Sequence, residues 1–189
     1  MRILGISGSL RSGSHNSRLL AAASRLLPAD VEYVRFDGLK AVPPFDEDDE
    51  ANPDPAVAHL RSEISAADGL LIATPEYNSS IPGQLKNAID WASRPFEETV
   101  LRNKNAAVIG ASTSMFGAVW SQAETRKVLG AGGARVLDRD LPLPYAEEHF
   151  DEAGRLTDPD LEATLEEILT ELVAQVQRSL DTRAAQAVG

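Results

Sequence analysis

Residues 7–17 read SGSLRSGSHNS and combine small hydroxyl side chains, two glycines and one arginine. They follow an apolar stretch at 3–6 and precede a helical pattern that begins near residue 15. A helix N-terminus presents unpaired N–H groups and a partial positive charge, and arginine adds charge-assisted, bidentate hydrogen bonds. The stretch therefore predicts a phosphate site with these donors: Ser9, Arg11, Ser14, Asn16 and Ser17.

The same residues limit what can carry the phosphate. They contain neither the G-x-x-x-x-G-K-[ST] motif nor the G-x-G-x-x-G fingerprint. Without a phosphate-loop lysine or an obvious magnesium ligand, a nucleoside triphosphate is disfavoured and a single phosphate fits better. A glycine–serine turn that merely caps a helix is the alternative at this point.

A second polar loop, TPEYNSSIP at 74–82, follows another apolar run. Its prolines stiffen the chain, and Tyr77 offers a flat apolar face with a polar tip. Asn78 brings an amide donor and a carbonyl acceptor, which suits the edge of a planar heterocycle. We expect Glu76 to position a neighbour or cap a helix rather than act as a base. An exposed tyrosine in an ordinary turn is the alternative.

The other polar candidates are less specific. The loop STSMFG at 112–117 offers Ser112 as a hydrogen-bond donor. His15 stands at the helix start within reach of a phosphate, but we expect it to be a solvated neighbour. His59 and His149 have no neighbours in the sequence that suggest a metal site or a catalytic triad, and we expect no metal.

Strand-like and helix-like patterns alternate along the chain. Strands are expected at 3–6, 31–36, 69–73, 106–111 and 134–137, and helices at 16–27, 55–65, 84–93, 118–129 and 160 to about 180. Asp54 is expected to cap the second helix, and Thr157 or Asp158 the last. The alternation predicts an α/β fold with five parallel strands in the order 2-1-3-4-5 and helices on both faces. Ligands of such sheets bind at the carboxyl ends of the strands, where the loops after strands 1, 3 and 4 meet.

Composition sets outer limits on the function. The 189 residues suffice for one domain over 1–189, and one reading of 181–189 is a disordered tail. The net charge of −11 disfavours nucleic acid and anionic membranes as partners, since both need a basic surface. The lack of cysteine excludes disulfides and thiolate chemistry. No apolar run approaches membrane length, and we expect a cytoplasmic protein.

Two motifs, GSLRSGSHNSRL at 8–19 and PEYNSSIPGQLKNAIDW at 75–91, together resemble the NADPH-dependent FMN reductase family. This flavodoxin-like family includes bacterial quinone, chromate and azo-dye reductases, and the likeness covers most of residues 1–180. It implies a flavodoxin-like three-layer sandwich that binds FMN. The matching positions are Ser9, Arg11, Ser14, Asn16 and Ser17 for the phosphate, Pro75, Glu76, Tyr77 and Asn78 along the isoalloxazine ring, and Ser112 as a further flavin contact.

The resemblance also implies an FMN-dependent NAD(P)H oxidoreductase. Hydride would pass from NADPH or NADH through bound FMN to a quinone or similar small acceptor, with no dedicated acid or base and with Tyr77 and Asn78 positioning the ring. Family members are commonly homodimers or homotetramers, which places the helices at 84–93 and 118–129 at a subunit interface. A one-electron flavodoxin carrier, a flavin-binding regulatory module without turnover, and FMN as a diffusing substrate are the alternatives.

Overall fold

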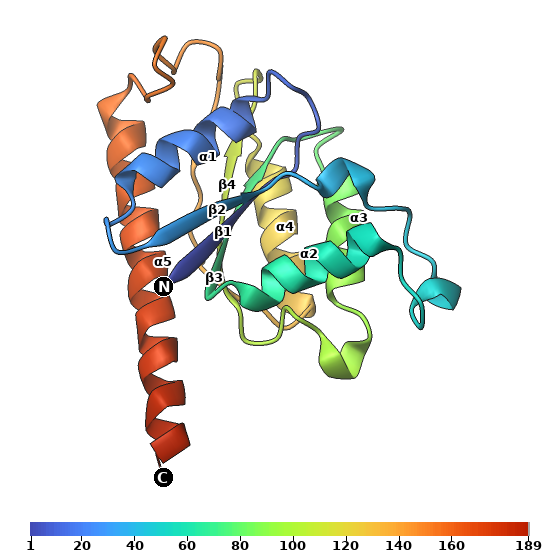
Figure 1. Cartoon of the computed structure of the whole chain (residues 1–189). Helices are drawn as coiled ribbons and strands as arrows, with labels where there is room; N and C mark the ends of the chain where they lie inside the picture. The colour runs from blue at the N-terminus through green and yellow to red at the C-terminus, as the bar shows by residue number, and fades with distance from the viewer. Residues whose placement is uncertain (189) are drawn as a thin grey trace.

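The computed structural model describes residues 1–188 and shows a parallel sheet between two layers of helices (Figure 1). The strands are β1 (Arg2–Ser7), β2 (Glu32–Phe36), β3 (Gly69–Thr74), β4 (Asn105–Ala111), β5 (Arg135–Val136) and β6 (Pro142–Leu143). The sheet order is β2-β1-β3-β4-β5, and β6 also pairs with β4. The predicted order 2-1-3-4-5 is confirmed.

Within residues 1–188, five α-helices cover the two faces of the sheet: α1 (His15–Leu26), α2 (Pro55–Ala66), α3 (Gly83–Ala92), α4 (Val119–Ala131) and α5 (Pro159–Val188). Helices α1 and α5 lie on one face, and α2, α3 and α4 lie on the other (Figure 1). Successive side chains of a strand point to opposite faces, so each strand serves both cores. In β3, Leu71 packs with the α1–α5 layer, whereas Leu70 and Ile72 pack with the other layer.

Two helix starts carry the capping residues expected from the sequence. Asp54 accepts a hydrogen bond from the Ala56 amide (2.7 Å), and Pro55 occupies the first position of α2. Asp158, rather than Thr157, accepts from two amides in the first turn of α5. These carboxylates satisfy N–H groups that have no partner within their helix.

The last strand differs from the single segment expected at 134–137. The structure keeps only a two-residue strand, β5, within that segment and adds a further strand, β6, after residues 137–141. The buried side chain of Gln122 in α4 donates to the Leu141 carbonyl (3.0 Å) and accepts from the Leu141 amide (3.0 Å). The Gln122 side chain thus satisfies the backbone of Leu141 just before β6. Local periodicity does not reveal a contact between residues so far apart in the sequence.

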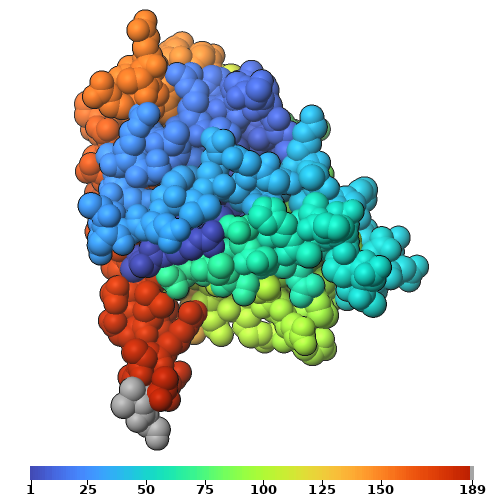
Figure 2. Space-filling model, viewed as in Figure 1, coloured from blue at the N-terminus to red at the C-terminus, as the bar shows by residue number. Residues whose placement is uncertain are grey.

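Helix α5 extends to Val188, beyond the predicted end near residue 180, and its last turns project past the rest of the fold (Figures 1 and 2). Residues 181–187 are exposed but helical, where the sequence suggested a disordered tail. Alanine and glutamine favour helix, and these residues extend the buried part of α5, whose last buried side chain is Val176. Gly189 lies outside the described residues. Within residues 1–188, no helix combines the length and the apolar character needed to cross a membrane.

The sheet brings three loops to one edge. Ser7 at the end of β1 lies opposite Ala73 of β3, and Thr74 lies opposite Gly110 of β4. The loops at 8–14, 75–82 and 112–118 therefore begin side by side at the carboxyl ends of their strands. Residues far apart in the sequence can thus contact one ligand.

Candidate active site

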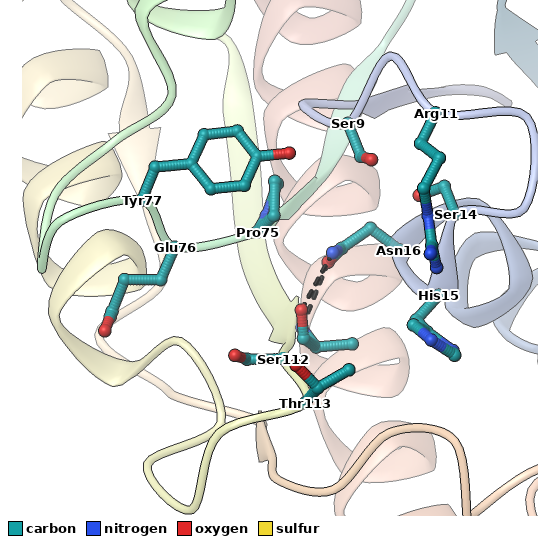
Figure 3. Close-up of a pocket in the computed structure, with 11 residues that line it drawn as sticks. Ser9, Arg11, Ser14, His15, Asn16, Pro75, Glu76, Tyr77, Ser112 and Thr113 are labelled. Atoms are coloured by element: carbon teal, nitrogen blue, oxygen red, sulfur yellow. Dashed lines mark hydrogen bonds between the residues drawn. The ribbon is translucent and has the colours of Figure 1, made fainter.

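A cavity of about 260 Å³ opens at this edge of the sheet (Figure 3). Eight of the ten residues predicted for the cofactor line it: Ser9, Arg11, Ser14, Asn16, Pro75, Glu76, Tyr77 and Ser112. Ser17 and Asn78 lie outside it. Its wall also includes three residues that the sequence did not assign to the site: His15, Ala111 and Thr113.

The loop after β1 leaves several donors open to an anion. Ser14 is the N-cap of α1, and its Oγ accepts from the Ser17 amide (3.1 Å). Within residues 1–188, the amides of Ser12 and Gly13 donate to no other protein group. The exposed Arg11 donates to the Gly13 carbonyl (2.6 Å). Open amides, the positive end of α1 and a guanidinium are the chemistry of an anion site.

Asn16 and Ser17 instead hold the loop in place. The Asn16 Nδ2 donates to the Ala111 carbonyl (2.9 Å), and its Oδ1 accepts from the Ala111 amide (3.0 Å), as the dashed lines in Figure 3 mark. The Ser17 Oγ donates to the Ser7 Oγ (3.2 Å). Because the Asn16 amide is engaged on both sides, we expect it to fix α1 against β4 rather than to donate to a phosphate.

The loop after β3 forms a tight hairpin at 77–80. The Tyr77 amide donates to the Ser80 carbonyl (3.2 Å), and the Ser80 amide donates to the Tyr77 carbonyl (3.1 Å). Asn78 and Ser79 have φ values of 53° and 58°, as a type I′ turn requires. The turn leaves Asn78 exposed at its tip and outside the cavity. Tyr77 is 54% exposed, and its hydroxyl points across the cavity toward the first loop (Figure 3).

Two carboxylates hold this hairpin against α4. The Glu76 Oε2 accepts from the Ser121 amide in the first turn of α4 (3.0 Å), which confirms the capping role expected of Glu76. Glu124 accepts from the Ser80 hydroxyl (2.5 Å) and the Ile81 amide (3.3 Å). Both hydrogen bonds lower the pKa of Glu124, the first more strongly, because they favour the charged carboxylate. The sequence did not indicate Glu124, because it lies 44 residues from Ser80.

The loop after β4 completes the cavity. Ser112 and Thr113 line it, and the Ser112 amide donates to the Leu143 carbonyl of β6 (3.0 Å). Gly117 has a φ of +56°, and a Cβ there would lie 2.5 Å from the Pro142 carbonyl carbon. Glycine is therefore needed where this loop passes β6.

The expectation that His15 is a solvated neighbour of the site is wrong. It is half-buried in the cavity wall, and its Nδ1 is shielded from solvent without a hydrogen-bond partner among the described residues. Burial lowers the pKa of His15 below 6.5, the charges of Arg11 and Arg18 lower it further, and Glu147 opposes them. Near neutral pH the imidazole is therefore an uncharged polar part of the wall.

These residues fit FMN in their chemistry. Arg11 and the hydroxyls of Ser9 and Ser14 lie on the α1 side of the cavity and suit a phosphate. Pro75 and Tyr77 lie across from them and offer flat apolar surface to a ring (Figure 3). The two ends match the two halves of a flavin mononucleotide.

Comparison with known proteins identifies the family. The model of a family described as NADPH-dependent FMN reductase matches residues 1–148. The chain belongs to this family. It is 42% identical over 180 residues to an NAD(P)H-dependent FMN reductase of Pseudomonas aeruginosa, with 94% of this chain and 96% of the relative covered. It is 32% identical to a 2-hydroxy-1,4-benzoquinone reductase of a Burkholderia species, with 94% and 97% covered.

Solved structures agree with this assignment. FerB, a flavoenzyme NAD(P)H:(acceptor) oxidoreductase of Paracoccus denitrificans, is 30% identical and superposes with a TM-score of 0.83 over 94% of this chain and 97% of that one. A flavodoxin variant of Pseudomonas aeruginosa, 19% identical with a TM-score of 0.58 over 94% and 99%, shares the fold. The resemblance drawn from the two motifs is thus confirmed: this member of the FMN reductase family is an NAD(P)H-dependent oxidoreductase that works with FMN.

Proposed function

We propose that this family member transfers hydride from NADPH or NADH, through bound FMN, to quinones or similar small acceptors. The cavity carries the proposal, because it joins anion donors to an exposed aromatic ring at the ends of β1, β3 and β4. Relatives named as FMN and quinone reductases support it. We also propose a cytoplasmic location, where NAD(P)H is supplied.

The first loop would hold the phosphate of FMN. Arg11 would exchange its bond to the neutral Gly13 carbonyl for a stronger, charge-assisted pair with the phosphate. The hydroxyls of Ser9 and Ser14 and the open amides of the loop would donate the remaining hydrogen bonds. Asn16 and Ser17 would keep this loop in place through their hydrogen bonds to Ala111 and Ser7.

The second and third loops would hold the ring. Pro75 and Tyr77 would bound one side of it, and Ser112 and Thr113 would meet another. When bound, FMN supplies the hydride chemistry, while the chain orients it and shields it from water. Glu76 stays bonded to the Ser121 amide, so it positions the hairpin rather than moving a proton.

We further propose a homodimer or homotetramer that uses α3 and α4. The ring centroids of Phe116 and Trp120 are 4.7 Å apart, and both side chains are exposed together with Met115. Exposed aromatic clusters of this kind favour protein contacts. A Trp120→Glu variant should therefore have a lower mass than the natural protein in light scattering. An oligomer of unchanged mass would count against this surface.

A one-electron carrier is the second candidate, favoured by the acidic composition and the flavodoxin likeness. A carrier would accumulate one-electron-reduced protein during photoreduction and would oxidise no NAD(P)H. A reductase would oxidise NAD(P)H with repeated turnover of quinone.

The visible spectrum of the purified protein tests the proposal, followed by anaerobic addition of NADPH or NADH and then of a quinone. We expect yellow protein that keeps FMN through dialysis, bleaches with the donor and regains its colour with the quinone. Colourless protein that binds no added FMN would overturn the proposal. Loss of FMN on dialysis with retained turnover would make FMN a diffusing substrate. Full FMN binding without turnover would indicate a regulatory module.

A further inference from the structure

A second cavity, of about 270 Å³, lies on the other side of the loop after β1. Ser9 and Arg11 line both cavities, so this loop is a wall between them. The rest of the second cavity comes from the same loop, the start of α1 and the chain at the end of β2. It includes Leu10, Arg35 and Lys40.

This second cavity gathers positive charge in an acidic protein. Arg11, Arg35 and Lys40 stand there against one carboxylate, Asp37, in a chain with a net charge of −11. The Arg35 Nε donates to the Asp37 Oδ1 (2.6 Å). The exposed Lys40 forms no ion pair within residues 1–188. Lys40 is therefore left without a carboxylate, and Arg35 and Lys40 together carry one more positive charge than Asp37 balances, which attracts an anionic group.

Asp37 also holds Arg35 in position. The hydrogen bond engages the Nε of Arg35, so the two Nη groups stay available for bidentate contact with a phosphate. Leu10 is exposed at the same cavity and offers apolar surface to a neighbouring base.

The spacing between the cavities indicates the ligand. Strand β1 alone separates β2 from β3, and neighbouring strands are about 4.8 Å apart, so the end of β2 lies about 10 Å from the ring-binding loop. A nicotinamide dinucleotide reacts at one end and carries adenosine at the other. With the nicotinamide at the flavin ring, the adenosine end can extend to the second cavity. There NADPH presents a 2′-phosphate where NADH presents a neutral hydroxyl.

We propose that the second cavity binds the 2′-phosphate of NADPH and sets the preference for NADPH over NADH. Lys40 and Arg35 pair with the phosphate, and Leu10 packs against the adenine. Arg11 stays with the FMN phosphate on its own side of the loop. This assignment rests on the proposed function, since it names the donor that the flavin site takes.

Kinetics of the FMN-saturated enzyme with each donor test the assignment. Lys40→Met and Arg35→Met should each lower kcat/KM for NADPH about 10-fold or more, as expected for a lost charge-assisted hydrogen bond, and leave kcat/KM for NADH within about two-fold. Arg25→Met is the matched control, because Arg25 is exposed on α1 and lines neither cavity. An equal fall with both donors, or an unchanged value with NADPH, overturns the assignment.

Equilibrium binding provides a readout that does not need turnover. Calorimetry compares 2′,5′-ADP with AMP on FMN-loaded protein, in which the first phosphate site is occupied. We expect 2′,5′-ADP to bind about 10-fold more tightly or better, and both variants to remove the difference. Equal or undetectable binding of the two nucleotides overturns the assignment, even if the enzyme oxidises NADPH. Selective binding of 2′,5′-ADP by a protein that oxidises no donor would keep this site and reject the proposed function.

Discussion

The loop after β1 and the loop after β3 border the same cavity but differ in how they are held. Arg11 and Gly13 are exposed in the first loop, and space around the Gly13 Cα is open. Its amides at 12 and 13 have no protein partner in residues 1–188. The second loop is closed by a type I′ turn, and Glu76 and Glu124 bond it to α4.

This difference suits the two halves of a flavin. A phosphate is recognised by charge and by many donors, and an exposed loop can adjust to it. A planar ring needs a wall in a fixed position, since apolar contact falls off over a fraction of an ångström. The first loop should therefore decide between FMN and riboflavin, while the second should act on both alike.

The largest expected effect separates the two flavins. Arg11→Met should weaken FMN by about 10- to 150-fold, from a lost charge-assisted contact of roughly 1.5–3 kcal/mol, and leave riboflavin nearly unchanged. Dissociation constants from flavin fluorescence measure this, with Arg25→Met as control. An equal loss for both flavins would break the division between the two loops.

The second loop should give the opposite pattern. Glu76→Ala leaves the Ser121 amide without its acceptor and loosens the hairpin. It should cost about 1–2 kcal/mol of stability and weaken FMN and riboflavin by the same factor. Thermal unfolding and the two dissociation constants check this, and the exposed Glu97→Ala in the 3-10 turn Phe96–Glu98 is the control. Selective loss of FMN would contradict a role in holding the ring.

His15 should make the first loop sensitive to pH. Its pKa lies below 6.5 because of burial, Arg11 and Arg18, with Glu147 opposing. A bound phosphate would raise this pKa, so FMN binding should take up a proton. Relative to His15→Gln, the natural protein should gain a few-fold in FMN affinity between pH 8 and pH 6. The His15→Gln variant serves as the control for titration of the FMN phosphate itself. Parallel pH profiles of the two proteins would show that His15 does not contact the phosphate.

The same shift predicts a stability effect without flavin. A folded-state pKa below 6.5 means that the unfolded chain binds more protons in this range. The neutral His15 therefore contributes to the free energy of unfolding above pH 6.5, and this contribution is lost as the pH falls through the lower folded-state pKa. The melting temperature of the natural protein should fall more steeply than that of His15→Gln between pH 7.5 and 5.5.

The smallest effect concerns the turn itself. Ser79 has a φ of 58°, and a type I′ turn prefers glycine at this position. Ser79→Gly should raise the unfolding free energy by about 0.5 kcal/mol and leave both flavin affinities unchanged. Ser80→Gly is the contrast, since it removes the hydroxyl bonded to Glu124 and should destabilise. A destabilised Ser79→Gly would mean that the Ser79 side chain has a role in the hairpin.

Much of this architecture was predictable from local patterns. Apolar runs such as residues 69–73 indicated central strands, and Asp54 and the pair Thr157 and Asp158 marked helix starts. Strand β6 and the helical residues 181–187 were missed, because the first depends on Gln122 and the second on continuation from a packed helix. The roles of the predicted site residues toward FMN stay predictions, and binding measurements will decide them.

By itself, the sequence determined the alternating elements and the polar loops that follow the strands, because these depend on periodicity and local backbone preference. It also carried the two family motifs, and the general rules for parallel sheets placed the three loops at one edge. Tertiary structure alone decided which loop side chains enter the cavity. It turned Ser17 inward to Ser7, left Asn78 at the hairpin tip and placed His15 in the wall. The physical reason is that side-chain direction in a loop follows backbone angles set by distant contacts, such as the bonds of Asn16 to Ala111, 95 residues away.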